Sequence, residues 1–169
     1  MIVLIVDGYN VIGDWPTLKT LKEKSLEDAR DQLIEIMAEY QAYTAYELII
    51  VFDAYNVRGA EKRKRVKNME IIFTKENETA DERIEKLIKD VKNVKTKVYV
   101  ATSDSQEQWT IFSQGALRKS ARELLLEVQA INKDIQINLE TNHKLTPKHK
   151  VILNQEILSK FEEMRRGRK

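Results

Sequence analysis

Short runs of hydrophobic residues, separated by longer polar stretches, predict the buried strands of this chain. Four runs are rich in β-branched side chains and largely uninterrupted, which is typical of strands covered on both faces of a parallel sheet. These runs are residues 2–6 (IVLIV), 47–52 (ELIIVF), 69–73 (MEIIF) and 97–101 (KVYVA). A fifth run, 135–139 (IQINL), alternates apolar and polar residues and predicts an edge strand. The pattern therefore predicts a sheet of about five strands.

Helical periodicity fills most of the intervals between these strands. Hydrophobic residues recur at helical spacing after Ser25, Thr79 and Ser120, and the sequences TADE and SARE at the last two positions fit capping boxes. A last helix is predicted at about residues 148–165. The exception is 47–73, where a long basic loop joins two strands and no helix is evident. Strands that alternate with helices predict an α/β fold with an open, mostly parallel sheet.

Composition narrows the class of protein. The chain has 169 residues, 42% of them hydrophobic and 33% charged, which predicts one ordinary globular domain. It contains no cysteine, so disulfides, cysteine-ligated zinc, iron–sulfur clusters and thiol nucleophiles are excluded. The N-terminal apolar run is too short for a signal peptide, and no run reaches the length of a membrane span. We therefore expect a cytoplasmic protein.

The charge is unevenly distributed although the net charge is only +2. Residues 58–68 (RGAEKRKRVKN) contain six basic side chains and one acidic one, and residues 160–169 contain five basic and two acidic ones. The rest of the chain is mildly acidic. Such clusters are either solvated surface runs or sites that hold a polyanion, and the charge alone does not decide between the two.

Four aspartates are predicted to converge at one edge of the sheet. Asp7 and Asp53 end predicted strands, Asp104 follows a third strand, and Asp81 lies in the first turn of a predicted helix. The carboxyl ends of parallel strands share one edge, where ligands bind in α/β proteins. Nearby carboxylates repel one another, so a divalent cation is the simple explanation, and ligation by oxygen alone indicates Mg²⁺ or Mn²⁺.

Each of these residues also has an ordinary structural explanation. Asp53 could form a turn, Asp81 could favour the dipole of its helix, and Asp104 could cap a helix at 105–112. Asn10, in the sequence DGYN, is either a loop residue or an oxygen donor to a metal or phosphate. It is much less plausible that all four aspartates have only such local roles than that any one of them does.

Other chemistries lack their motifs. The two histidines, His143 and His149, both lie near the C-terminal end of the sequence and follow no predicted strand. There is no glycine-rich dinucleotide motif, no P-loop and no G-x-S-x-G elbow. A receiver-like phosphorylatable domain is disfavoured because Tyr9 stands where a second acid is expected. Carboxylates that hold a metal beside a basic loop instead predict a phosphodiesterase that acts on a nucleic acid.

The sequences VDGYNVI, VFDAY, TADERIE and VATSD, in this order and spacing, resemble the NYN branch of the PIN-like nuclease superfamily. More narrowly, they resemble the YacP-like group, which includes a ribosome-associated endoribonuclease. The resemblance covers about residues 1–140. It implies a PIN-like three-layer α/β/α sandwich with a central, mostly parallel sheet, and cleavage of RNA with Mg²⁺ or Mn²⁺. It also implies a ribosomal partner, with messenger RNA as the substrate.

The resemblance assigns family site positions to Asp7, Asn10, Asp53, Asp81 and Asp104. We expect Asp7, Asp81 and Asp104 to hold the cation, Asp53 to shape the site, and Asn10 to orient water or the scissile phosphate. Water would attack in line and leave 5′-phosphate and 3′-hydroxyl ends. Glu82 is next to Asp81 but points one helical step away, so its role is open.

Basic residues are predicted to bind RNA. At SQGALRKSARE the resemblance suggests that Arg118 and Ser120 contact substrate. The complete predicted RNA-binding set is Arg58, Lys62, Arg63, Lys64, Arg65, Lys67, Arg118, Arg165, Arg166, Arg168 and Lys169. We expect a nuclease domain at 1–140, a basic helical extension packed on it at 141–169, and a monomer rather than an oligomer. The alternative is a non-catalytic RNA- or ribosome-binding module with a vestigial acidic pocket.

Overall fold

The computed structural model describes residues 1–55, 57–141, 159–161 and 165. These residues divide into two compact units, Met1–Leu124 and Leu125–Lys169. The first unit contains the whole sheet, and the second contains most of the last long helix. The predicted domain boundary at residue 140 stays a prediction.

The first unit is built on a six-stranded sheet. Its strands are β1 (Ile2–Asp7), β2 (Glu47–Phe52), β3 (Lys62–Val66), β4 (Met69–Phe73), β5 (Lys97–Ala101) and β6 (Leu117–Lys119). Their order across the sheet is β3-β4-β2-β1-β5-β6, and every neighbouring pair is parallel except β3 and β4. β1 lies inside the sheet between β2 and β5, which explains why its side chains are almost all buried.

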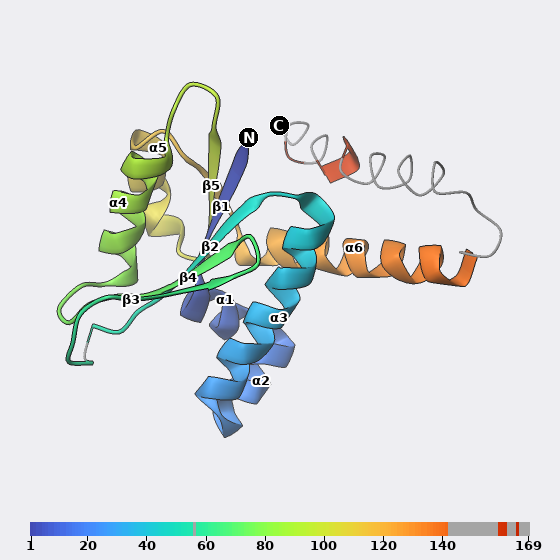
Figure 1. Ribbon diagram of the computed structural model, residues 1–169, viewed down its shortest axis with the longest axis horizontal. Coiled ribbons are helices and arrows are strands. Elements are labelled where there is room, and N and C mark those ends of the chain that lie inside the picture. Colours follow the sequence, from blue (N-terminus) through green and yellow to red (C-terminus); the bar gives the residue numbers. More distant parts are fainter. Residues whose placement is uncertain (56, 142–158, 162–164, 166–169) are drawn as a thin grey trace. The chain divides into compact units, whose positions relative to one another are not determined.

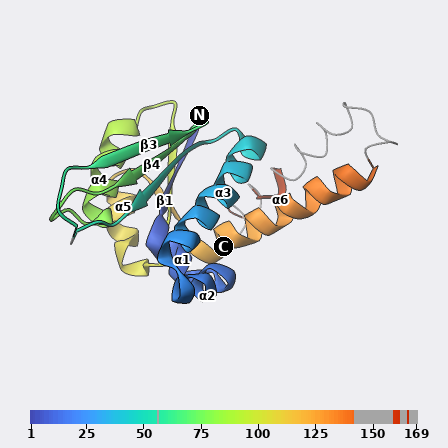
Figure 2. The same ribbon diagram turned by 60° about the horizontal axis from the view of Figure 1, so that its bottom comes forward.

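Helices cover both faces of this sheet. The helices are α1 (Gly8–Asp14), α2 (Pro16–Lys24), α3 (Leu26–Thr44), α4 (Ala80–Val91), the short 3₁₀ helix η1 (Ser105–Glu107), α5 (Gln108–Ser113) and α6 (Ala121–Thr141). Figures 1 and 2 show α1–α3 on one side of the sheet and α4 on the other. The fold is therefore the predicted three-layer α/β/α sandwich.

The two faces have separate apolar cores because side chains alternate along each strand. On one face, Val3, Ile5 and Val51 pack with Ile84 and Leu87 of α4. Leu4, Val6 and Ile50 point to the other face, which α1–α3 cover, and all three are almost completely buried. Burial on both faces is what the uninterrupted hydrophobic runs predicted.

The caps predicted from sequence are confirmed. The side chains of Ser25, Thr79 and Ser120 accept hydrogen bonds from the backbone N–H groups of Asp28, Glu82 and Glu123, respectively, three residues further along each helix. Each bond satisfies an N–H group that the helix itself leaves without a partner. Ser120 therefore has a structural role at the start of α6.

The predicted edge strand at 135–139 is wrong, because these residues continue α6. Val128, Ile131, Asp134 and Asn138 are all buried, which is a helical spacing. Asp134 and Asn138 are polar, while the more exposed Ile137 is apolar, so the hydrophobic pattern conceals the helix. The real additional strands are β3, in the predicted basic loop, and the short β6.

Candidate metal centre

The candidate centre lies at the carboxyl edge of the sheet, where the chain changes direction between strands. β2, β3 and β4 lie on one side of β1 in the sheet, whereas β5, the next strand along the chain, lies on the other side of β1. The strand order therefore switches sides at β1. Asp7 ends β1, and Asp104 and Glu107 follow β5. Ligands of open α/β sheets bind at this switch point, because the loops there diverge and leave a crevice.

Asp7 is the most buried acid of the centre, with 8% of its surface exposed. Burial, the largest cause, and the charges of Asp81, Asp53 and Asp104 together raise the pKa of Asp7 to about 7, although the backbone N–H of Asn10 opposes the shift. A buried carboxylate whose negative charge is opposed, among the described residues, only by one backbone N–H group destabilises the metal-free protein. A cation at this position would remove the cost.

Gly8 allows the chain to turn directly after Asp7. A Cβ atom at this position would overlap ring carbons of Phe52, which ends β2. The ring of Tyr9 also packs on Phe52, with centroids 5.0 Å apart. The sequence DGYN thus places a carboxylate at the strand end and packs the following residues against the neighbouring strand.

Three carboxylates from separate elements form the acidic cluster. Asp7, Asp81 and Glu107 each offer an oxygen atom, and these atoms all lie within 4.8 Å of one another. Asp81 is in the first turn of α4, and Glu107 ends η1. Residues far apart in sequence therefore converge on one point.

The raised pKa of Glu107 shows that the acidic cluster favours binding of a positive charge. Burial raises the pKa of Glu107, and a hydrogen bond with Asp81 and the charges of Asp81, Asp7 and Asp104 raise it further. In the metal-free protein this raised pKa favours the protonated form of Glu107, which reduces the repulsion. Closely spaced, oxygen-only ligands fit a hard divalent cation, so the acidic cluster could hold a metal ion.

Sequence reasoning missed Glu107. A signal was present, because SDSQEQ places a glutamate three residues after Asp104, and one turn of a 3₁₀ helix returns that side chain to the same side. The predicted site positions stop at the strand end and at Asp104 just after it, whereas Glu107 comes from the turn that follows.

Asp104 is near the acidic cluster, but its carboxylate accepts a hydrogen bond from a backbone N–H group two residues further along the chain. Its Oδ1 atom accepts a hydrogen bond of 2.9 Å from the N–H of Gln106 and caps η1. It lines a pocket of about 240 Å³ together with Asp81 and Glu107. The structure thus gives Asp104 the capping contact, and it places Glu107 rather than Asp104 in the closest group of three carboxylates.

Asp53 is also engaged with backbone groups. Its two carboxylate oxygens accept hydrogen bonds from the N–H of Tyr55, at 2.8 Å, and from the N–H of Ala80, at 3.2 Å. Ala80 is the first residue of α4, so Asp53 ties the end of β2 to the helix that carries Asp81. The role of Asp53 in shaping the site stays a prediction.

Asn10 points its side-chain oxygen at Ser103, whose backbone N–H and hydroxyl both donate to Oδ1. Ser103 lies between β5 and η1. Asn10 therefore ties the first turn after β1 to the turn that carries Asp104 and Glu107. Its oxygen is occupied by these contacts, which leaves the amide NH₂ as the group that can face a ligand.

The predicted basic loop is the exposed edge strand β3, and it distributes its cations over two faces. Residues opposite each other on β3 and β4 share a face, so Lys62 and Lys64 lie on the α3 side and Arg63 and Arg65 on the α4 side. Arg63 pairs with Glu61 and Glu70. Its charge is thus partly neutralised within the protein.

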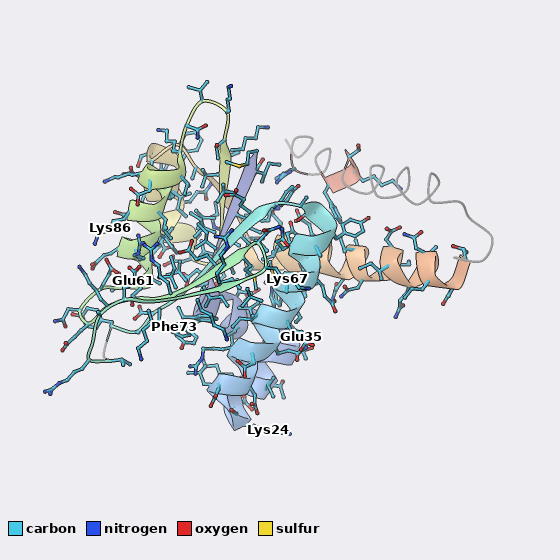
Figure 3. The ribbon with its side chains drawn as sticks, viewed as in Figure 1. Lys24, Glu35, Glu61, Lys67, Phe73 and Lys86 are labelled. Atoms are coloured by element: carbon cyan, nitrogen blue, oxygen red, sulfur yellow. The ribbon has the colours of Figure 1, made fainter. Side chains whose placement is uncertain are left out.

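Only one end of this strand is near the acidic cluster. Lys62 pairs with Phe73 at the carboxyl edge of the sheet, where Arg58 also lines a pocket. Lys67 is at the turn between β3 and β4, and Figure 3 shows it at the other end of the hairpin from Phe73. The structure therefore does not bring Lys67 close to the acidic cluster.

The remaining predicted residues are placed as follows. Arg118 is half-buried in β6, and Glu82 is exposed on α4. Arg165 is half-buried in the second unit. Arg166, Arg168, Lys169 and most of the predicted helix at 148–165 lie outside the described residues.

Fold and site together define a three-layer α/β/α domain with an acidic cluster, able to hold a metal ion, at the switch point of its sheet. The chain belongs to the YacP-like NYN domain family, whose sequence pattern matches residues 4–166. NYN domains are generally nucleases. The resemblance inferred from sequence motifs is thus confirmed at the level of the family.

Relatives cover nearly the whole chain. The protein YacP of Bacillus subtilis (strain 168) is 56% identical over 167 residues, which is 99% of this chain and 98% of YacP. The crystal structure of Rae1 (YacP) from Bacillus subtilis matches with a TM-score of 0.74 at 56% identity, covering 99% of this chain and 96% of that one. A mutant form of the same protein matches with a TM-score of 0.76 at 52% identity and the same coverage.

No helix in the described part of the chain has the length and apolar character needed to cross a lipid bilayer.

Proposed function

We propose that this protein is a metal-dependent endoribonuclease that hydrolyses RNA to leave 5′-phosphate and 3′-hydroxyl ends. One observation carries the proposal: Asp7, Asp81 and Glu107, from β1, α4 and η1, bring their oxygens within 4.8 Å of one another at the switch point. Membership of a family of nucleases supports it. A cytoplasmic location and a monomeric state stay predictions.

Asp7, Asp81 and Glu107 would hold the cation, and Mg²⁺ or Mn²⁺ suits a set of carboxylate ligands. Such an ion, when bound, supplies Lewis acidity toward phosphate oxygens and lowers the pKa of water. Asp104 lines the same pocket and adds negative charge next to these three ligands. The described carboxylates thus concentrate charge at a point where a phosphodiester could be bound through a cation.

Asn10 and Asp53 act as positioning residues in this proposal. Asn10 joins the turn after β1 to the turn after β5, and Asp53 joins the end of β2 to α4. These contacts hold the segments that carry the three ligands. Their removal should therefore loosen the acidic cluster without removing a ligand.

RNA is the proposed polyanion, with messenger RNA on the ribosome as the proposed setting. Cations of β3 and of the loop before it lie beside the acidic cluster at the carboxyl edge, and cations give salt-dependent binding to a phosphate backbone. The ribosomal partner rests on the resemblance to the YacP-like group. It is tested by adding ribosomes to the cleavage assay.

The experiment incubates the full chain with 5′-labelled single-stranded RNA, and with translating ribosomes in a parallel arm, in Mg²⁺ or Mn²⁺. We expect cleavage that EDTA abolishes and that Asp7→Asn reduces at least about 100-fold, since loss of an outer partner of a metal site alone costs 10–100-fold. The chemical group at the 5′ end of the downstream product is also determined, and we expect a phosphate there. Equal cutting by Asp7→Asn and wild type, or a 2′,3′-cyclic phosphate product, would refute the mechanism.

The same experiment addresses the binding-module alternative. RNA or ribosome binding that persists in Asp81→Ala, with no cleavage by the wild-type protein in either arm, would favour a binding module. Cleavage by the wild-type protein that is lost in Asp81→Ala favours the nuclease.

A further inference from the structure

A second cavity lies next to the acidic cluster at the carboxyl edge of the sheet. It has a volume of about 210 Å³, and we call it the Arg30 pocket after the cation on its α3 side. The residues that line it include Tyr9, Arg30, Asp53, Arg58, Lys62 and Phe73. No sequence motif indicated Arg30, which is a single basic residue on a long amphipathic helix.

Arg30 is held in place from two directions. Its Nη1 atom donates a hydrogen bond of 2.9 Å to the hydroxyl of Tyr9, and its guanidinium carbon lies 5.8 Å from the centroid of the Phe73 ring. The residue is half-buried. A guanidinium fixed by a ring and a hydroxyl loses little freedom when it binds an anion, and its remaining N–H groups suit a phosphate.

The pocket carries an excess of positive charge. Arg30, Arg58 and Lys62 line it, and within the described part of the chain none of them forms an ion pair with a carboxylate. Asp53 is the one acid among the lining residues, and both of its oxygens accept backbone hydrogen bonds. The pocket therefore attracts an anion from solution.

The pocket also presents aromatic surface. Phe73 stacks on Phe52 with centroids 5.3 Å apart, and Tyr9 packs on the same Phe52 ring. Phe73 and Tyr9 are only half-buried, so part of each is accessible. Cations combined with accessible rings match a ligand that has both an anionic group and a flat base, which describes a nucleotide of a single strand.

The Arg30 pocket and the acidic cluster share one edge and one connecting segment. Tyr9 of the pocket follows Asp7 of the cluster by one intervening residue, and Asp53 lies close enough to raise the pKa of Asp7. A strand of RNA bound at the acidic cluster can therefore extend into the pocket.

We propose that the Arg30 pocket is a nucleotide-binding subsite for single-stranded RNA, which holds the nucleotide next to the scissile phosphate. Arg30 and Lys62 bind its phosphate group, and Phe73 and Tyr9 contact its base. The position next to a scissile phosphate rests on the proposed nuclease function. The binding itself needs neither metal nor cleavage.

The test measures binding of a fluorescein-labelled single-stranded RNA pentamer to the full chain in EDTA by fluorescence anisotropy. We expect Arg30→Gln and Lys62→Gln each to weaken binding about tenfold, and each to reduce the salt dependence of log K by about 0.7, as for one lost phosphate contact on a single strand. Lys97→Gln is the matched control. It removes one exposed charge at the amino end of β5 and should leave affinity unchanged within twofold.

Base contact is tested separately. Phe73→Leu should weaken RNA binding severalfold with no change in the salt slope, and AMP should displace the pentamer at a lower concentration than inorganic phosphate does. Lys62 is exposed, so its variant is expected to fold even if replacement of Arg30 disturbs α3. Wild-type affinity in Lys62→Gln and in folded Arg30→Gln would overturn the subsite. Equal displacement by AMP and phosphate would overturn the base contact.

Cleavage kinetics separate this proposal from the proposed function. Arg30→Gln should raise KM about tenfold and change kcat little, whereas Asp7→Asn should lose kcat and keep its RNA affinity in EDTA. If the wild-type chain cuts no RNA but Arg30 still governs pentamer binding, the nuclease proposal fails and the subsite stands. If RNA is cut with wild-type KM by Arg30→Gln, the subsite fails and the nuclease stands.

Discussion

The side chain of Glu107 hydrogen-bonds that of Asp81, which brings the end of η1 and the first turn of α4 together. Both are acidic, and burial, this hydrogen bond and the neighbouring charges raise the pKa of Glu107, which favours a proton on its carboxyl group. A divalent cation bound by these residues would compensate the same negative charge.

Glu107→Gln should lower the rate of RNA cleavage at least about 100-fold and weaken Mn²⁺ binding, because it removes one of three clustered carboxylates. Cleavage rate and calorimetric Mn²⁺ titration are the measurements. The control is Glu82→Gln, which neutralises an exposed acid adjacent to Asp81 and should behave as wild type. Unchanged Mn²⁺ affinity in Glu107→Gln would remove Glu107 from the site.

Asp7→Asn should stabilise the metal-free protein at pH 8. Burial, the charges of its neighbours and an opposing backbone N–H set the pKa of Asp7 at about 7, above its ordinary value of 3.8. A raised carboxyl pKa means that the folded state binds the proton more tightly than the unfolded state. Stability is therefore lost as the pH rises from about 4 to 7, and the cost remains above pH 7.

The expected gain for Asp7→Asn is about 2–4 kcal/mol in the free energy of unfolding at pH 8 in EDTA, from the size of the pKa shift. It should shrink toward zero at pH 4. Urea unfolding at both pH values measures it, with the exposed Asp14→Asn as control. Mg²⁺ should stabilise the wild-type protein more than Asp7→Asn. A loss of stability in the variant at pH 8 would contradict the assigned environment.

Asp53→Ala should destabilise the fold by about 1 kcal/mol, the usual value of a lost cap, because the N–H groups of Tyr55 and Ala80 lose their acceptor. Asp53→Asn keeps one acceptor oxygen and should have about half the effect. Both variants should retain more cleavage activity than Asp7→Asn, since Asp53 is outside the acidic cluster. Stability comes from urea unfolding, and an Asp53→Ala protein with wild-type stability would refute the tie to α4.

Glu61→Gln should destabilise the protein by about 2 kcal/mol at pH 7, because it leaves the buried guanidinium of Arg83 without a negatively charged partner. Partial burial raises the pKa of Glu61, but hydrogen bonds from Arg63 and Arg83 outweigh it and lower the pKa overall. The stabilisation is therefore present above the ordinary carboxyl pKa and is lost as the pH falls through the lowered one.

Urea unfolding of Glu61→Gln at pH 7 and at pH 3 tests this sign. The control is Glu35→Gln, on an exposed position of α3 (Figure 3), which should change stability little at either pH. A deficit of Glu61→Gln that grows on acidification would contradict the assignment.

Much of the fold could be predicted from local pattern. Four strands and three helix caps follow from runs of hydrophobic side chains and from Ser and Thr at helix starts, which act over a few residues. The helix at 135–139 could not, because its buried positions hold Asp134 and Asn138. Polar residues at buried positions of a helix carry no hydrophobic signal.

The residues of the acidic cluster were also only partly predictable from the sequence. The sequence by itself determined that Asp7 and Asp81 lie at the carboxyl edge, because strand ends and helix starts of a parallel sheet must meet there. Only the tertiary structure decided which further acid joins them, since Asp53 and Asp104 turn to backbone N–H groups and Glu107 turns inward. That choice depends on distances of a few ångströms between elements, which no periodicity of side chains encodes.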